Sequence, residues 1–156
     1  MGTAPTAAGV DLARAISQLF EQVWSAALGE PLRTASAACD AELAAAAVER
    51  FCVSIRGDWC GAVVLSCPRG TATEFAASLL GKPHEELSAS EIDATLFELV
   101  NIFGGNLKAV LPGRNELALP CRAPLELPLD RSALAHEQAL SFRGWPLRLQ
   151  VFSALP

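Results

Sequence analysis

Apolar residues recur every three or four positions in three stretches of the chain, and this spacing predicts helices that bury one face. The first stretch begins near Asp11 and stops at Gly29, with Pro31 beyond it. Its apolar stripe consists of Leu12, Ile16, Leu19, Phe20 and Val23. A long amphipathic helix is therefore expected near the start of the sequence.

The other two helical stretches open with a capping-box pattern, in which a Ser or Thr and a Glu three residues later satisfy each other's backbone N–H groups. One box spans residues 71–74, and its helix closes at Gly81, followed by Pro83. The second box spans residues 88–91 and opens a longer helix that reaches Pro112. These signals predict the boundaries of both helices.

Runs rich in β-branched and aromatic residues predict strands between and after the helices. Residues 49–57 and 59–67 meet at an R-G-D turn, and residues 137–144 and 147–155 meet at R-G-W-P, so each pair is expected to form an antiparallel hairpin. Further strand candidates are residues 116–127 and 31–37. The Ala-rich run at 41–50 remains ambiguous, because its propensity favours a helix and its position before a hairpin favours a strand.

The order of these elements predicts an α+β fold in two layers, with long helices packed on one face of a largely antiparallel sheet. A length of 156 residues suits a single domain, spanning 1–156, that can bury most of its apolar surface in one core.

Charge and hydropathy then narrow the classes of function. The net charge is −5 and no Lys/Arg cluster is present, which argues against nucleic-acid binding. The apolar runs are shorter than the roughly 18 to 20 residues that span a bilayer, and the N-terminus lacks the features of a secretory signal. We therefore expect a cytoplasmic protein without a membrane segment.

The five cysteines form an odd set without a C-x-x-C motif, and the two histidines lie far from them in sequence. These spacings match no known type of zinc site, so no metal site is predicted. Most of the cysteines lie in strand-like runs, where a small buried hydrophobic residue is expected. Reduced thiols fit the cytoplasmic location.

The third helix places its residues in two opposite arcs when each residue advances by about 100°. The apolar arc should face the sheet and contains Ile92, Leu96, Leu99, Phe103, Leu107 and Val110. The outward arc contains Ala94, Glu98, Asn101, Gly105 and Lys108, and Phe97 and Ile102 border it on its two sides. A carboxylate and an amide thus stand on an outer strip of small residues with apolar edges.

The adjacent Gly104 and Gly105 need an explanation, because each Gly costs about 1 kcal/mol relative to Ala inside a helix. A close approach by another macromolecule would explain Gly105 on the outer face, while Gly104 also suits close packing. Glu98 and Asn101, at i and i+3, are neighbours on that surface. An ordinary solvated helix face explains the same pair, which arises by chance in roughly one chain of this length in three.

The motif resembles that of the CheX family of chemotaxis phosphatases, which is related to CheC and FliY. The family signature is E-x-x-N, then twenty-two residues and a Pro, and here Glu98, Asn101 and Pro124 meet that spacing. The run N-I-F-G-G-N also resembles the family's N-x-x-x-G-N continuation, which includes Gly105 and Asn106. The order of elements is similar over nearly the whole chain.

Two further details qualify the resemblance. The family often has Asp or Ser four residues before the Glu, whereas this chain has Ala94 there and Asp93 one place earlier. Because a single E-x-x-N is present, the chain is similar to the one-site CheX type rather than to the two-site CheC type.

The resemblance implies a phosphatase that hydrolyses the aspartyl phosphate of a response-regulator receiver domain such as CheY. Asn101 would position the attacking water, and Glu98 would bind the receiver's active-site lysine. Ala94, Phe97, Ile102, Gly105 and Lys108 would form the partner-binding surface around them. The phosphatase would need no cofactor of its own, since the receiver supplies Mg²⁺. The family also implies a homodimer, which we expect to form through the sheet.

Two rival functions remain open. An interaction module could bind a receiver or a flagellar-switch partner through the same helix face without hydrolysing anything. A small-ligand sensor is less well supported, because no polar cluster in the sequence converges on an evident pocket.

Overall fold

The computed structural model describes residues 7–31, 33–45, 47–123 and 133–153. Seven strands and four α-helices form this part of the chain, with one short 3₁₀-helix between α3 and α4. In chain order they are α1 (Ala7–Leu28), β1 (Arg33–Thr34), α2 (Ala37–Ala45), β2 (Val48–Gly57), β3 (Gly61–Pro68), α3 (Arg69–Leu80), η1 (His84–Glu86), α4 (Ala89–Val110), β4 (Asn115–Leu117), β5 (Cys121–Arg122), β6 (Leu134–Phe142) and β7 (Trp145–Ser153).

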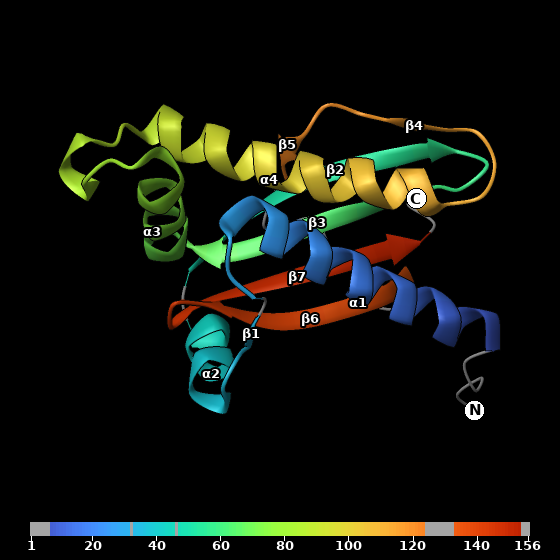
Figure 1. The fold of residues 1–156 in the computed structure, drawn as a ribbon, viewed down its shortest axis with the longest axis horizontal. Helices are drawn as coiled ribbons and strands as arrows, with labels where there is room; N and C mark the ends of the chain where they lie inside the picture. Colours follow the sequence, from blue (N-terminus) through green and yellow to red (C-terminus); the bar gives the residue numbers. More distant parts are fainter. Residues whose placement is uncertain (1–6, 32, 46, 124–132, 154–156) are drawn as a thin grey trace.

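The strands form one sheet in the order β1-β6-β7-β3-β2-β4, with β5 also paired to β2 (Figure 1). All strand pairs within the described residues are antiparallel. Both predicted hairpins are confirmed, since β2 pairs with β3 and β6 pairs with β7. At the second turn Arg143 and Gly144 have φ values of 50° and 86°, the left-handed region that two-residue hairpin turns require.

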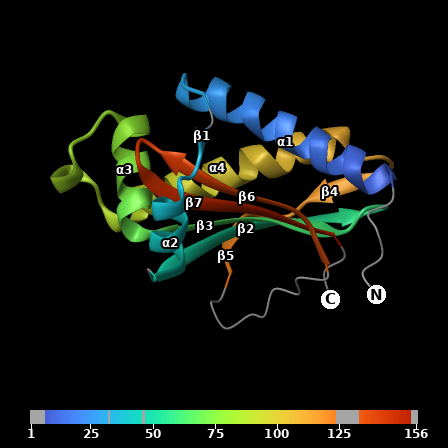
Figure 2. The ribbon, with the colours of Figure 1, turned by 90° about the horizontal axis from the view of Figure 1, so that it is seen from below.

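Helices α1 and α4 cover one face of the sheet, and Figure 2 shows them on the same side. Their inner stripes meet where Phe20 packs edge-on against Phe103, with ring centroids 4.8 Å apart. Both rings are buried in the main core cluster, and truncating such a side chain to Ala typically costs about 3 to 5 kcal/mol. The predicted α+β arrangement of two layers is therefore confirmed.

Helix α2 resolves the ambiguous Ala-rich run, because the helix ends at Ala45 and strand β2 starts at Val48. Its residue Asp40 accepts a hydrogen bond of 2.8 Å from Arg148 Nη2 on β7. The Cys39 thiol also donates to the carbonyl of Gly144 in the β6–β7 turn. The helix propensity of the run therefore predicts its first half correctly, and its position before a hairpin predicts its second half correctly.

The predicted capping box at residues 71–74 is wrong. Helix α3 starts two residues earlier, at Arg69, and its N-cap is Pro68 without a side-chain cap. Thr71 is buried inside the helix, where its hydroxyl donates a 2.9 Å hydrogen bond to the Pro146 carbonyl on β7. The C-terminal signal is correct, since Gly81 has a φ of 63° and caps the helix.

The predicted strand at 116–127 is also only partly correct. Within the described residues it consists of β4 and β5, two short strands that pair with different parts of β2. The register shifts by one residue between them, since Ile55 pairs with Leu117 whereas Cys52 pairs with Cys121. Leu119, between the two strands, is 88% exposed.

Candidate functional site

Helix α4 is held at its N-terminus by the predicted capping box, which the structure confirms. Ser88 Oγ accepts from the Glu91 backbone N–H at 3.1 Å, and the Glu91 carboxylate accepts from the Ser88 N–H at 2.9 Å. Glu91 also pairs with Lys82. The hydrogen bonds from Lys82 and from the Ser88 backbone lower the pKa of the Glu91 carboxyl. The start of the motif helix is thereby fixed to the loop before it.

The buried face of α4 agrees with the predicted apolar arc except at its end. The buried residues are Ile92, Leu96, Leu99, Val100, Phe103, Gly104 and Leu107. Val110, which we predicted to face the sheet, is 57% exposed, whereas the next residue, Leu111, is buried in the core.

Glu98 and Asn101 lie on the outer face of α4, as predicted. Glu98 is exposed and Asn101 is half-buried. In the part of the chain that the structure describes, neither side chain makes a hydrogen bond or an ion pair. A carboxylate and an amide therefore stand one helical turn apart with their hydrogen-bonding capacity unused.

The flanking residues predicted to bind a partner do not all lie together. Ala94 is exposed and Gly105 half-buried on the same strip as Glu98. Phe97 packs edge-on against Phe51 of β2, with ring centroids 5.4 Å apart, so much of it is bound to the core. Lys108 is exposed but ten residues beyond Glu98, about 15 Å along the helix. There it lines a separate hollow with residues from the end of β2, the α4–β4 loop and the start of β4.

A mostly apolar groove of about 510 Å³ lies beside Glu98, whereas Asn101 is not among its lining residues. It lies between the end of α1, the end of α3 and the middle of α4, and is lined by Ala27, Leu79, Leu80, Glu91, Ala94, Thr95, Glu98, Leu99 and Ile102. Glu98 thus borders a groove whose floor is aliphatic. Leu79 and Leu80 are 42% and 45% exposed, whereas half of the leucines that the structure describes are buried.

The sequence reasoning missed Ala27, Leu79 and Leu80. A usable signal was present, because two adjacent leucines at the end of a helix point in directions about 100° apart, which extends the apolar face beyond a single stripe. Ile102, which was predicted to border the site, does line the groove.

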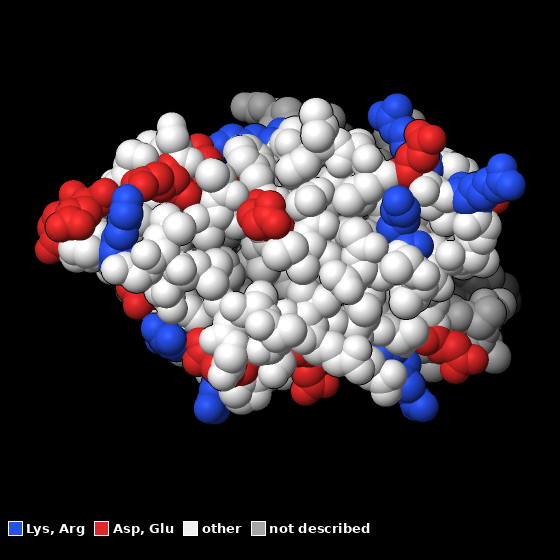
Figure 3. All heavy atoms as spheres, turned by 45° about the horizontal axis from the view of Figure 1, so that its top comes forward, with Lys and Arg blue, Asp and Glu red and all other residues white. Residues whose placement is uncertain are grey.

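The surface over α1 and α4 is largely uncharged, with acidic and basic side chains gathered around its edge (Figure 3). The sequence accounts for this pattern along α4, since Glu98 is the one charged residue between Asp93 and Lys108. Glu98 is therefore an isolated carboxylate on this stretch of α4.

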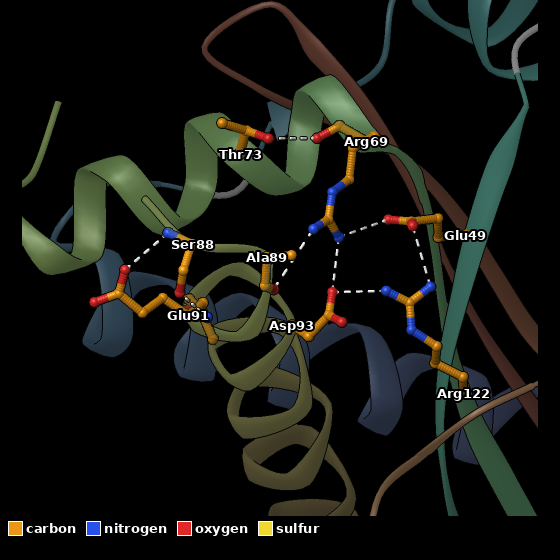
Figure 4. Close-up of polar contacts among 9 residues, drawn as sticks. Glu49, Arg69, Thr73, Ser88, Ala89, Glu91, Asp93 and Arg122 are labelled. Atoms are coloured by element: carbon orange, nitrogen blue, oxygen red, sulfur yellow. Dashed lines mark hydrogen bonds and ion pairs between the residues drawn. The ribbon is translucent and has the colours of Figure 1, made fainter. Parts of the chain in front are cut away.

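Asp93 does not belong to the outer strip but to an ion-pair network on the flank of α4 (Figure 4). Its Oδ1 accepts from Arg69 Nη1 at 2.7 Å and from Arg122 Nη2 at 2.6 Å, and both arginines also bind Glu49 of β2. Partial burial works to raise the pKa of Asp93, but the hydrogen bonds from Arg69 and Arg122 outweigh it and lower that pKa. Asp93 therefore connects α4 to α3, β2 and β5.

Asn106 is the last residue of the N-x-x-x-G-N run in the sequence. Its side chain is exposed, and its Nδ2 donates 2.8 Å to the Ile102 carbonyl one turn earlier. Pro124, the last residue of the sequence signature, lies outside the described residues.

Nowhere among the described residues do three His, Cys, Asp or Glu side chains gather into a group that could hold a metal ion. Nor is any described helix long and apolar enough to cross a membrane.

The sequence matches the family model described as chemotaxis phosphatase CheX over residues 51–142, which is more than half of the chain and includes all of α4. The chain belongs to the CheX family. This finding confirms the resemblance inferred from the motif. A search of the curated proteins finds no match.

Solved structures of CheX-type proteins share the fold. The CheX protein of Vibrio vulnificus is 13% identical with a TM-score of 0.69, and the match covers 98% of this chain and 100% of that one. A chain of the CheX–CheY–BeF₃–Mg²⁺ complex from Borrelia burgdorferi is 14% identical with a TM-score of 0.71, over 94% of this chain and 99% of that one. FliY of Thermotoga maritima is 14% identical with a TM-score of 0.54, over 99% and 93%. At these identities the likeness establishes the fold alone.

Proposed function

We propose that this CheX-family protein hydrolyses the aspartyl phosphate of a response-regulator receiver domain, with Asn101 and Glu98 as the residues that act on it. The observation that carries the proposal is the state of these two side chains. Both stand on the outer face of α4, where Glu98 lines an apolar groove, and neither has a polar partner in the described part of the chain.

Asn101 would position the attacking water. Phosphoryl transfer depends mainly on in-line placement of the nucleophile and on stabilisation of charge. An amide can accept a proton of the water through its oxygen and donate through its nitrogen, and it adds no negative charge beside a phosphate. The half-buried position of Asn101 restricts the motion of the side chain, which favours one orientation of the bound water.

Glu98 would bind the active-site lysine of the receiver. Its exposed carboxylate lacks an internal counter-ion among the described residues, so docking replaces water rather than an existing ion pair. A charge-assisted contact of this kind is stronger than a neutral hydrogen bond and fixes the register of docking. The CheX–CheY–BeF₃–Mg²⁺ complex of a protein with the same fold supports a receiver as the partner and Mg²⁺ as a component brought by it.

The groove beside Glu98 would receive an apolar side chain of the receiver. Ala94 and Gly105 present little bulk on the strip to either side of the pair, so another backbone can approach α4 closely there. Burial of groove atoms would contribute affinity at about 25 cal/mol for each Å² of apolar surface removed from water.

A non-catalytic docking module is the alternative, in which the same face binds a receiver or a flagellar-switch protein. One observation favours it: a chain of the FliM–SpeE complex from H. pylori has this fold, with a TM-score of 0.59 at 9% identity. Turnover separates the two functions, because a docking module does not accelerate loss of phosphate when it is present in sub-stoichiometric amounts.

The experiment measures loss of phosphate from purified phosphorylated receivers with the protein at about one tenth of the receiver concentration. We expect catalytic turnover with at least one receiver. The turnover rate of Asn101→Ala should be lower by about 10²-fold or more, because misplacing a reacting group typically costs about that factor. Asn106→Ala is the matched control, since it removes an amide from the same helix whose bond runs to its own backbone. Equal turnover in wild type and Asn101→Ala would remove Asn101 from the mechanism, and absence of turnover with every receiver that binds would favour the docking module.

A further inference from the structure

Two thiols face each other on the edge of the sheet, outside the candidate site. Cys52 of β2 and Cys121 of β5 are directly paired across the antiparallel ladder. Their sulfur atoms are 3.4 Å apart, in contact but not bonded. Residues opposite each other in such a ladder project to the same face, so the contact follows from the register of the two strands.

The pair lies on the face of the sheet that points away from α4. The neighbouring residue Phe51 packs against Phe97 of α4, and successive strand residues alternate between faces. Cys52 accordingly packs against the small apolar cluster of Ala62, Val64 and Phe152. The two thiols therefore share an environment separate from Glu98 and Asn101.

The two cysteines differ in accessibility in a way that suits a two-step oxidation. Cys121 is exposed, whereas Cys52 is half-buried. Burial, and secondly the contact with Cys121, raise the pKa of the Cys52 thiol to about 12. Because the thiolate is the reactive form, Cys121 is the thiol that reacts first with an oxidant from solution.

The other three cysteines of the chain make different contacts. Cys39 donates to the Gly144 carbonyl and Cys60 to the Gly57 carbonyl, both at 3.5 Å. Cys67 is 1% exposed inside the main core. None of these contacts involves a second sulfur, so the arrangement of Cys52 and Cys121 is particular to the β2–β5 pair.

We propose that Cys52 and Cys121 form a redox modification site that closes to an intramolecular disulfide on exposure to a peroxide and reopens with a thiol reductant. The Cys121 thiolate attacks one peroxide oxygen, an S–O bond forms, the O–O bond breaks, and the hydroxide that leaves takes up the proton released by the Cys121 thiol to give one water. Cys52 then attacks the sulfenic sulfur, the S–S bond forms, the S–O bond breaks, and the hydroxyl leaves as a second water with the Cys52 proton. The two thiols lose two electrons and the peroxide gains them.

Closure needs only a small movement of β5 toward β2. A disulfide has an S–S length of about 2.05 Å, so the sulfurs must approach by a little over 1 Å. Strand β5 has two residues, and a short edge strand can make this adjustment without disturbing the core. Arg122, the other residue of β5, lies over the Phe51 ring and binds Glu49 and Asp93 on the opposite face of the sheet. A disulfide at Cys121 would therefore also restrict the motion of Arg122 in this ion-pair network.

The test treats the full chain with a small excess of hydrogen peroxide, counts free thiols and maps the cross-linked peptides by mass spectrometry. We expect about two of the five thiols to be lost, a Cys52–Cys121 cross-link, and full recovery with dithiothreitol. The oxidised protein should melt about 5 to 10 °C higher, because the bond closes a long loop. Cys60→Ser, which removes an exposed lone thiol, should still form the cross-link, and Cys121→Ser should not.

A second measurement uses the wild-type protein, so it does not depend on whether a variant folds, and the binding step needs no oxidant. Phenylarsine oxide binds two thiols that lie close together, so wild type should bind it in a one-to-one ratio, and this binding should block formation of the cross-link. The proposal is overturned if wild type fails to bind phenylarsine oxide, if oxidation stops at Cys121 while Cys52 stays free, or if the disulfides formed join separate chains.

Discussion

Gly104 and Val53 touch across the interface between α4 and β2, so closely that a Cβ atom on Gly104 would overlap a methyl group of Val53. The same atom would lie 3.1 Å from Leu117 Cδ1. The next residue, Gly105, is different, because a Cβ there would meet only Leu117 Cδ2, at an ordinary 3.9 Å. The adjacent glycines thus have separate causes: Gly104 is required by packing, and Gly105 is not.

Substituting the two glycines by Ala should therefore have opposite effects. Gly104→Ala should lower the free energy of unfolding by about 1 to 3 kcal/mol, the range for overpacking a close contact. Gly105→Ala should leave it unchanged or raise it by up to about 1 kcal/mol, because Ala is the better helix former. Urea unfolding of both variants checks this, and a destabilised Gly105→Ala protein would show that the outer strip is packed rather than open.

Replacing Glu98 by Gln should weaken receiver binding while leaving the fold intact. The variant keeps the shape but removes the charge that would pair with a lysine, so affinity should fall by about 1 to 3 kcal/mol if the pair is desolvated. Titration of a phosphorylated receiver measures the change, and hydrolysis should partly return at high receiver concentration. Glu21→Gln, at an exposed position on α1, is the charge-matched control and should bind like wild type.

The groove predicts that Leu79→Ser lowers receiver affinity more than it lowers stability. Leu79 is already 42% exposed, so the substitution removes little from the core but makes part of the groove polar. Val110→Ser removes a more exposed apolar residue outside the groove and is the control. We expect affinity to fall about tenfold in the first variant only. Equal affinities would mean that the receiver does not use the groove.

Asp93→Asn should destabilise the protein in a pH-dependent way. Because the pKa of Asp93 is lowered in the folded chain by Arg69 and Arg122, its contribution is complete above the unfolded pKa of about 3.9 and is lost as pH falls through the folded pKa. We expect a cost of about 1 to 2 kcal/mol at pH 6 and a smaller one at pH 3. Unfolding curves at both pH values measure it, with Glu116→Gln as an exposed control. A cost that does not change with pH would contradict an ionic role.

Self-association is a separate prediction. The family resemblance and the Pro-rich run at 116–130, part of which lies outside the described residues, lead us to expect a symmetric dimer formed through the sheet that leaves both α4 helices accessible. Light scattering at tens of micromolar should give twice the chain mass of 16.4 kDa. A monomer mass at that concentration would contradict the prediction.

The sequence predicted features that depend on local chemistry. The Ser88 capping box, the Gly81 stop and the outward position of Glu98 follow from hydrogen bonding and spacing within one helix, and all three are confirmed. The box at Thr71 failed because a carbonyl from Pro146, far away in sequence, binds the hydroxyl instead. Local pattern alone cannot reveal such a competitor.

The same limit explains what was missed at the site. The groove is formed by three helices, and the network around Asp93 joins α4 to β2, α3 and β5, so both depend on packing between distant segments. Asp93 had been noted only for its distance from the family position. The structure shows that a shift of one residue along α4 turns a carboxylate from the outer strip to the flank, where two arginines bind it.

The length of the strands at the margins of the sheet affects the tendency of separate chains to aggregate through their sheet edges. One margin is β1, with two residues, and the other is shared by β4 and β5, with three and two residues separated by a register shift. An edge of this kind offers too few consecutive N–H and C=O groups to template a further strand. Growth of the sheet by edge-to-edge addition, the first step toward fibrous aggregates, is therefore hindered at the β4–β5 margin, whereas β1 pairs with only Leu140 and Ser141 of the nine-residue strand β6.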